Sequence, residues 1–113
     1  MNSFEATNEI ANLLNNKKAV DVVLIDISEK SSFADYFVNA STGSERQLRS
    51  LADDVEDKFA ELGFNTRGKE GLPESGWILI DGGDVIVNLF TRDVREKYSL
   101  DKIWGDCKII NFE

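Results

Sequence analysis

The sequence predicts an α/β protein, α+β-like in organisation, with a single mixed β-sheet of about five strands flanked by helices. The first observation is the stretch from Trp77 to Phe90, where a glycine pair joins two β-branched apolar runs. This pattern is typical of a β-hairpin, and apolar residues on both faces favour a place inside a covered sheet. The second is the order helix–strand–strand–helix–strand–strand–strand–helix, which favours helices packed on one sheet.

The first half of the chain is expected to alternate helices and strands. Apolar side chains at helical spacing mark the two helices, and β-branched runs mark the strands. Ser44 with Gln47 three residues later is a capping-box signature, and Gly63 is a typical helix stop. The expected elements are a helix at 3–16, a strand at 19–27, a polar connection at 28–32, a strand at 34–40, a turn at 41–43 and a helix at 44–62.

The second half is expected to contain the remaining strands. A short strand at 65–67 is predicted to return beside the strand before it through a right-handed crossover. Residues 68–76, which include the only proline, are predicted to form a loop. After the hairpin, a short helix is expected from Thr91 to Lys97, and a single turn from Ser99.

The two arms of the hairpin meet at Gly82 and Gly83, and an aspartate stands on each side of this pair. Glycine tolerates the positive φ that a tight hairpin turn requires. Alternate residues of a strand point to opposite faces, so Trp77, Leu79 and Asp81 share one face of the first arm. We expect this odd-numbered face to be the exposed one.

Composition and charge exclude several classes of function. A chain of 113 residues suits one domain, 1–113, and the absence of histidine removes Ser–His and Cys–His nucleophilic pairs and most zinc chemistry. The single cysteine, Cys107, allows no internal disulfide, which fits a reducing compartment.

The net charge of −8 disfavours direct, sequence-specific nucleic-acid binding and favours a basic protein partner. No run is long enough to span a membrane and the start is not a signal peptide, so a cytoplasmic location is expected.

The catalytic candidates are weak. Gly43 and Ser44 opening a helix are compatible with anion binding, but capping alone explains Ser44. A strand, a Gly-Ser turn and a helix also begin nucleotidyltransferase folds, whose Mg²⁺ chemistry needs two carboxylates at alternate positions of a following strand. The next strong strand offers only Asp81. Asp81 and Asp84 bracket the hairpin turn, where aspartates usually accept local backbone hydrogen bonds. No catalytic residue, metal or cofactor is therefore predicted.

Three large aromatic residues with polar groups lie outside the expected helix faces: Trp77, Tyr98 and Trp104. Trp77 follows Glu70 and Glu74, and acidic residues also flank Trp104. Aromatic anchors beside acidic side chains suit an interface with a basic protein, although a core role is equally compatible with each residue alone.

The chain as a whole resembles the ribosomal silencing factor (RsfS, or Iojap) family. The matching segments include Ala34-Asp35-Tyr36-Phe37-Val38, Ser44-Glu45-Arg46-Gln47, Ala52-Asp53-Asp54-Val55-Glu56, Glu70-Gly71, Trp77-Ile78-Leu79-Ile80-Asp81, Gly83-Asp84-Val85-Ile86-Val87, Arg95-Glu96-Lys97-Tyr98 and Trp104-Gly105-Asp106. Three positions depart from the family pattern: Gly82 replaces a larger residue, Asn88 stands where histidine is common, and Thr91-Arg92 lacks a proline.

The resemblance implies a nucleotidyltransferase-like architecture without catalytic residues, and therefore a protein that is not an enzyme. It also implies binding to the large ribosomal subunit through ribosomal protein uL14, which blocks subunit joining and lowers translation when nutrients are short. Family members resemble one another in forming homodimers when free, and organelle relatives are tied to large-subunit assembly.

Together these observations predict a contact set on the ribosomal protein, with Trp77 as its anchor. Its members are Glu70, Leu72, Trp77, Leu79, Asp81, Asp84, Tyr98 and Trp104. Two alternatives remain open. One is a large-subunit assembly factor, and the other is a divergent Mg²⁺-dependent nucleotide-binding protein that uses Ser44, Asp81 and Asp84.

Overall fold

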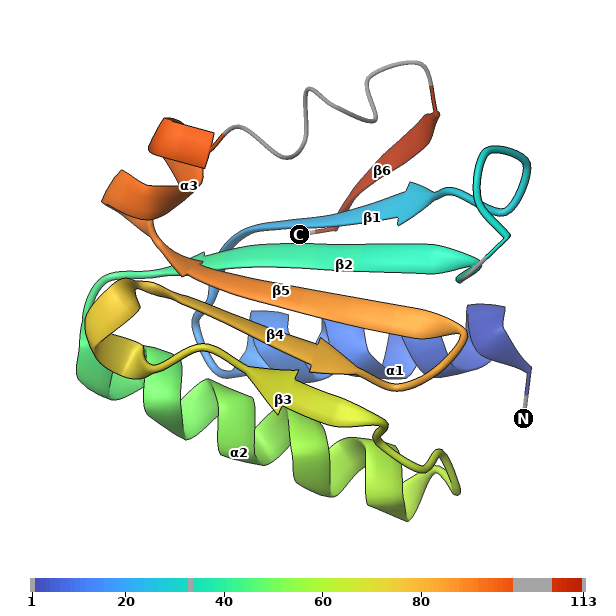
Figure 1. The fold of residues 1–113 in the computed structure, drawn as a ribbon, viewed down its shortest axis with the longest axis horizontal. Helices are drawn as coiled ribbons and strands as arrows, with labels where there is room; N and C mark the ends of the chain where they lie inside the picture. The colour runs from blue at the N-terminus through green and yellow to red at the C-terminus, as the bar shows by residue number, and fades with distance from the viewer. Residues whose placement is uncertain (1, 33, 99–106, 113) are drawn as a thin grey trace.

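The computed structural model describes residues 2–32, 34–98 and 107–112, which form three α-helices, a 3-10 helix and six strands (Figure 1). The elements are α1 (Ser3–Asn16), β1 (Val20–Asp26), β2 (Tyr36–Thr42), α2 (Glu45–Glu61), β3 (Gly68–Glu70), the 3-10 helix η1 (Pro73–Ser75), β4 (Trp77–Asp81), β5 (Val85–Thr91), α3 (Arg92–Tyr98) and β6 (Lys108–Phe112).

The strands form one mixed sheet in the order β3-β4-β5-β2-β1-β6. Among the described strands, only β2 and β5 pair in parallel, and every other neighbouring pair is antiparallel. This confirms the predicted class of one mixed sheet flanked by helices. The β4–β5 hairpin does lie inside the sheet, although the central pair is β5 with β2. The sixth strand, β6, was not predicted from the sequence.

The predicted strand at 65–67 and its crossover are wrong. The short strand is β3, Gly68–Glu70, and it lies at the sheet edge, antiparallel to β4. The parallel neighbour of β2 is instead β5. The predicted loop at 68–76 therefore contains both β3 and η1. A segment of three residues carries too little pattern to reveal its partner, and the chain forms its parallel pair with β2 only at β5.

Helices α1 and α2 pack side by side on one face of the sheet (Figure 1). The core lies between them and the strands, and it takes alternate residues from β1, β2, β4 and β5. Its largest group consists of Ile10, Ala11, Leu14, Ala19, Val22, Leu24, Val38, Ala40, Leu48, Leu51, Ala52, Val55, Phe59, Ile78, Ile80, Val85, Val87 and Leu89. Burial of this apolar face is what drives both helices onto the sheet.

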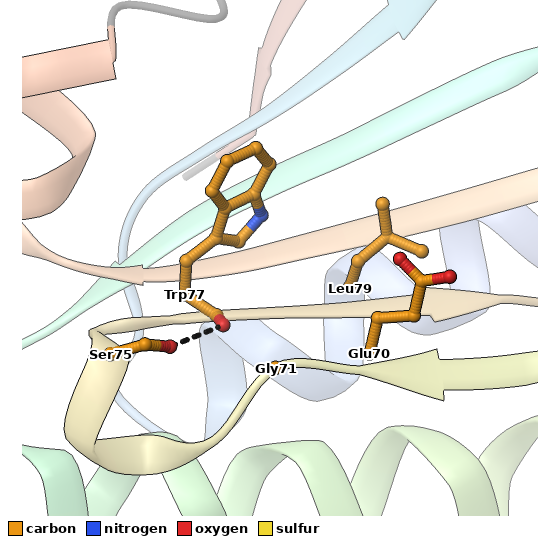
Figure 2. A pocket seen from close by; sticks show the side chains of 5 residues that line it. All are labelled: Glu70, Gly71, Ser75, Trp77 and Leu79. Carbon is orange, nitrogen blue, oxygen red and sulfur yellow. Dashed lines mark hydrogen bonds between the residues drawn. The ribbon is translucent and has the colours of Figure 1, made fainter.

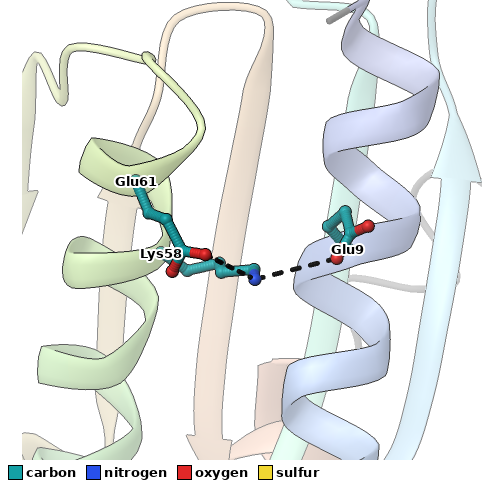
Figure 3. A network of polar contacts seen from close by, with 3 residues as sticks. All are labelled: Glu9, Lys58 and Glu61. Carbon is teal, nitrogen blue, oxygen red and sulfur yellow. Dashed lines mark hydrogen bonds and ion pairs between the residues drawn. The ribbon is translucent and has the colours of Figure 1, made fainter.

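An ion-pair network also joins the two helices. Lys58 on α2 lies 3.7 Å from the carboxylate of Glu9 on α1 and 3.4 Å from that of Glu61 (Figure 3). Both carboxylates are substantially exposed, so solvent screening leaves this network a small contribution to stability.

The predicted helix cap at Ser44 is confirmed. The Ser44 Oγ accepts a hydrogen bond from the Gln47 backbone N–H at 3.1 Å. The Gln47 side chain accepts from the backbone of Gly43, one residue earlier than a capping box requires. The predicted turn at 41–43 is shorter than expected, because Ser41 and Thr42 belong to β2. Across the described part of the chain, no helix combines the length and apolar character needed to cross a membrane.

The opposite face of the sheet, named here the far face, carries a second apolar cluster. Its members are Val23, Ile25, Ile27, Ala34, Phe37 and Ile86, with Leu79 and Cys107 packed against them. The far-face residues of β5 are buried, whereas those of β4 are only partly buried. The expectation that both arms are covered on each side therefore holds for β5 and only partly for β4.

The hairpin turn is shifted by one residue from the predicted Gly-Gly pair. The Gly82 N–H donates to the Val85 carbonyl at 2.9 Å, which leaves Gly83 and Asp84 at the centre of the turn. Gly83 has a φ of 94°, a left-handed value that favours glycine. Gly82 is needed for space instead, because a Cβ there would lie 2.5 Å from the Phe59 ring.

Replacing Gly82 by alanine is expected to lower the free energy of unfolding by about 1–3 kcal/mol, because the added methyl overpacks against Phe59. Urea denaturation followed by circular dichroism measures this change. The matched control is Gly68→Ala, where a Cβ meets nothing within 4 Å, and its stability should change by no more than about 0.5 kcal/mol. Equal midpoints for the two variants would contradict the packing account.

Candidate functional site: the far face of the sheet

Strand β4 divides its side chains between the core and the far face. Ile78 and Ile80 are buried under the helices, whereas Trp77, Leu79 and Asp81 are partly exposed on the far face. The prediction that the odd-numbered face is the exposed one is therefore confirmed. A large indole that stays partly exposed on a sheet surface is a typical anchor for a partner protein.

A hollow of about 290 Å³ lies beside Trp77 at the sheet edge. Its walls come from β3, the residue that follows it, η1 and β4, and they consist of Glu70, Gly71, Ser75, Trp77 and Leu79. Figure 2 shows the side chains of Trp77, Leu79 and Glu70 rising on the same side of the sheet. The antiparallel register explains this arrangement, because Glu70 lies directly opposite Leu79.

The Trp77 ring is held in one orientation by its neighbours on β5. Its Nε1–H donates to the Asn88 Oδ1 at 3.1 Å, and its ring lies 5.3 Å from that of Phe90. The Asn88 amide in turn donates to the Asn39 Oδ1 at 3.1 Å. Because the indole can only donate, the amide oxygen of Asn88 must face it, which directs the amide nitrogen to Asn39.

The two asparagines are almost fully buried, at 0% and 1% exposure. Sheet register places them side by side, since Asn39 pairs with Asn88 across the parallel strands and Leu79 lies opposite Asn88. A buried amide without partners would be costly, so their hydrogen bonds to each other and to Trp77 compensate for their burial. Sequence reasoning did not assign either residue to the site. The available signal was an asparagine in the middle of each apolar strand.

The loop between β3 and β4 is shaped by a glycine and a serine. Gly71 has a φ of 97°, and a side chain there would overlap the Trp77 carbonyl oxygen. The Ser75 Oγ lies 2.7 Å from the carbonyl oxygen of Leu72 and 3.2 Å from that of Trp77. This local bonding leaves the Leu72 side chain outside, with 65% of its surface exposed. Leu72 of the predicted contact set is thus an exposed apolar side chain, but it is not among the residues that line the hollow.

Ion pairs connect this edge of the sheet to α2. The Lys69 Nζ lies 2.9 Å from Glu56 and 3.7 Å from Asp53. The hydrogen bond to Glu56 raises the pKa of the Lys69 ammonium above its ordinary value, and the nearby carboxylate charges act in the same direction. On η1, Glu74 lies 3.9 Å from Arg49. Both β3 and η1 are therefore tied to the helix layer behind the hollow.

The acidic residues of the hairpin lie away from the hollow. Asp81 is on the far face, but it stands four residues beyond Trp77, about 13 Å along the strand. Its Oδ1 accepts the Gly83 N–H at 2.8 Å, which is the local role expected of a turn aspartate. Asp84 is exposed in the turn. The structure therefore gathers Glu70, Trp77 and Leu79 of the contact set, and leaves these two aspartates at the other end of the hairpin.

Two further members of the predicted contact set cannot be placed in this surface. Trp104 lies outside the described residues. Tyr98 is the last residue of α3, but its side chain lies outside the described part of the structure.

The residues of the nucleotide-binding alternative do not come together. Ser44 follows the end of β2 that lies beside Thr91, whereas Asp84 precedes the end of β5 that lies beside Tyr36. These ends are separated by a seven-residue strand, roughly 20 Å long. Within residues 2–32, 34–98 and 107–112, no group of three acidic or cysteine side chains is placed to hold a metal ion.

The sequence and fold are similar to those of known proteins. Residues 1–113 match the family model described as "Ribosomal silencing factor during starvation". The chain is 34% identical to ribosomal silencing factor RsfS of Halalkalibacterium halodurans over 113 residues, which is 100% of this chain and 97% of the relative. It is 35% identical to the RsfS of Bacillus subtilis over 97 residues, 86% of this chain and 82% of that one.

A more distant relative has a name that concerns assembly. The chain is 26% identical over 98 residues to the mouse protein named "Mitochondrial assembly of ribosomal large subunit protein 1", covering 84% of this chain and 43% of that one. Among solved structures, a crystal structure of a Chromobacterium violaceum protein matches with a TM-score of 0.88 at 31% identity. This match covers 93% of this chain and 88% of that one. The chain belongs to the ribosomal silencing factor (RsfS) family.

Proposed function

We propose that the protein is a cytoplasmic silencing factor that acts by occlusion and not by catalysis. It binds ribosomal protein uL14 on the large ribosomal subunit, blocks the docking of the small subunit and so lowers translation when nutrients are short. Family membership supports the class of function. The observation that carries the proposal is Trp77, a partly exposed indole held by Asn88 beside a hollow on the far face that Glu70 also lines.

A preorganised aromatic residue suits this task. Binding costs less entropy when the anchor is already in its bound orientation, and Asn88 and Phe90 hold the indole in place. A standard interface of about 1,600 Å² is sufficient for specific binding when a few such residues contribute most of the energy. Occlusion requires no reactive group, in agreement with the separation of Ser44 from Asp84.

Charge supports a basic partner. The chain carries 21 acidic and 13 basic residues, Glu70 lines the hollow, and Glu74 on η1 precedes the lining residue Ser75. A negative surface attracts a basic protein over distances comparable to the Debye length, about 8 Å at physiological ionic strength. In the free protein, we propose that a second copy pairs with this one to form a homodimer.

The second candidate is an assembly factor for the large subunit. The mouse relative whose name includes assembly of the ribosomal large subunit favours it. The same far face would serve both functions, because each requires binding to the large subunit. The two functions differ in the particle recognised, so binding to precursor subunits should be compared with binding to mature ones.

The central test is sedimentation of the tagged protein through a sucrose gradient. We expect it to co-migrate with free large subunits and to be absent from joined ribosomes, because occlusion and joining exclude each other. Recovery of the protein in joined ribosomes would rule out the occlusion mechanism.

Replacing Trp77 by alanine is expected to weaken binding to uL14 by about 2 kcal/mol or more, because the variant loses the anchor. Isothermal titration calorimetry with the purified ribosomal protein measures the loss. The control is Phe4→Ala, an aromatic residue on α1 with 49% exposure, which should bind normally. Wild-type affinity of a folded Trp77→Ala protein would remove Trp77 from the interface.

Association with the ribosomal protein is expected to slow as salt rises, because ions screen the attraction between exposed charges. Stopped-flow or surface plasmon resonance at several salt concentrations gives the association rate. An association rate that stays constant across this series would show that charge does not steer the encounter.

A further inference from the structure

The hollow beside Trp77 combines an apolar surface with a single carboxylate. Trp77 and Leu79 supply the apolar surface and Glu70 supplies the charge, and all three side chains rise on the same side of the sheet (Figure 2). On the basis of the proposed function, we infer that this hollow receives one lysine or arginine side chain of the ribosomal protein. Its aliphatic part lies on Trp77 and Leu79, and its cationic group meets Glu70.

Glu70 is suited to this role because its charge is not already neutralised. Across the described part of the chain, its carboxylate has neither an ion pair nor a hydrogen bond. The neighbouring carboxylates differ, since Glu74 lies 3.9 Å from Arg49 and Glu56 lies 2.9 Å from Lys69. An exposed carboxylate beside apolar surface favours a ligand that brings its own positive charge.

The chemistry of the walls selects the ligand class. A purely apolar side chain would remove water from the Glu70 carboxylate without replacing it, which is unfavourable. A phosphate or a carboxylate would be repelled by Glu70. Lysine and arginine suit both parts of the hollow. Their aliphatic stems pack on the apolar surface, and their charged ends remain in a polar environment beside the carboxylate.

The fixed indole strengthens the same preference. A cation above an aromatic face is attracted by the ring quadrupole, and tryptophan is the strongest such partner. The ring of Trp77 is held by its hydrogen bond to Asn88 and its contact with Phe90, so it meets the ligand without rearranging. The hollow is therefore lined by apolar surface for the aliphatic part of the ligand side chain, by the Trp77 indole and by the Glu70 carboxylate.

The test compares Glu70→Gln with Glu74→Gln, a matched control that removes the same charge from η1, outside the walls of the hollow. Binding to immobilised, purified uL14 is followed by surface plasmon resonance. Glu70→Gln should raise the dissociation rate about tenfold, because the cationic group loses its partner. Glu74→Gln should change mainly the association rate, and by less than about threefold. Thermal unfolding confirms that both variants remain folded.

Equal effects of the two substitutions would overturn the inference, because they would show only general charge steering. A Glu70→Gln variant that dissociates from uL14 at the wild-type rate would overturn the inference as well. In either case, loss of binding in Trp77→Ala would leave the proposed function standing. If wild-type protein fails to bind uL14, the proposed function itself fails, and the two failures are thus distinguishable.

Discussion

The parallel pairing of β2 with β5 is the constraint on which the rest of the structure depends. It joins two antiparallel groups, β6-β1-β2 on one side and β5-β4-β3 on the other, into a single sheet. Its register also decides which side chains meet across the two groups. Asn39 comes to lie against Asn88, and through Asn88 against the Trp77 indole. A shift of one residue would send one of the two amides into the apolar core.

The two faces of the sheet carry different tasks. The helix face holds the packing that stabilises the fold. It has little room for larger side chains, since a Cβ at Gly82 would lie 2.5 Å from the Phe59 ring. The far face around Trp77 holds buried polar groups that orient a partly exposed ring. Stability and recognition are therefore built on opposite sides of the same strands, and the ion pairs of Lys69 tie the edge of the recognition side to the helices.

Patterns in the sequence were sufficient to predict features that depend on interactions between residues close together in the chain. Helix spacing, the Ser44 cap, the hairpin and the exposed face of β4 depend on residues near one another in the chain, and all were predicted. Pairing across long separations was not predictable in the same way. The edge position of β3 and the Asn39–Asn88 contact depend on register between distant strands. The contact set shows the same division, since Glu70, Trp77 and Leu79 converge whereas Asp84 lies at the other end of the hairpin.

The alternation along β4 has a consequence for how the family can vary. Each residue of the strand serves either the interior or the partner, so a single inserted or deleted residue would exchange the two sets at once. Isoleucines would then face water, while an indole and a carboxylate would be forced beneath the helices. Length changes are therefore excluded from β4 itself and belong in the connection between α2 and β3. On β4, the recognition surface can therefore change only by substitution at every second position.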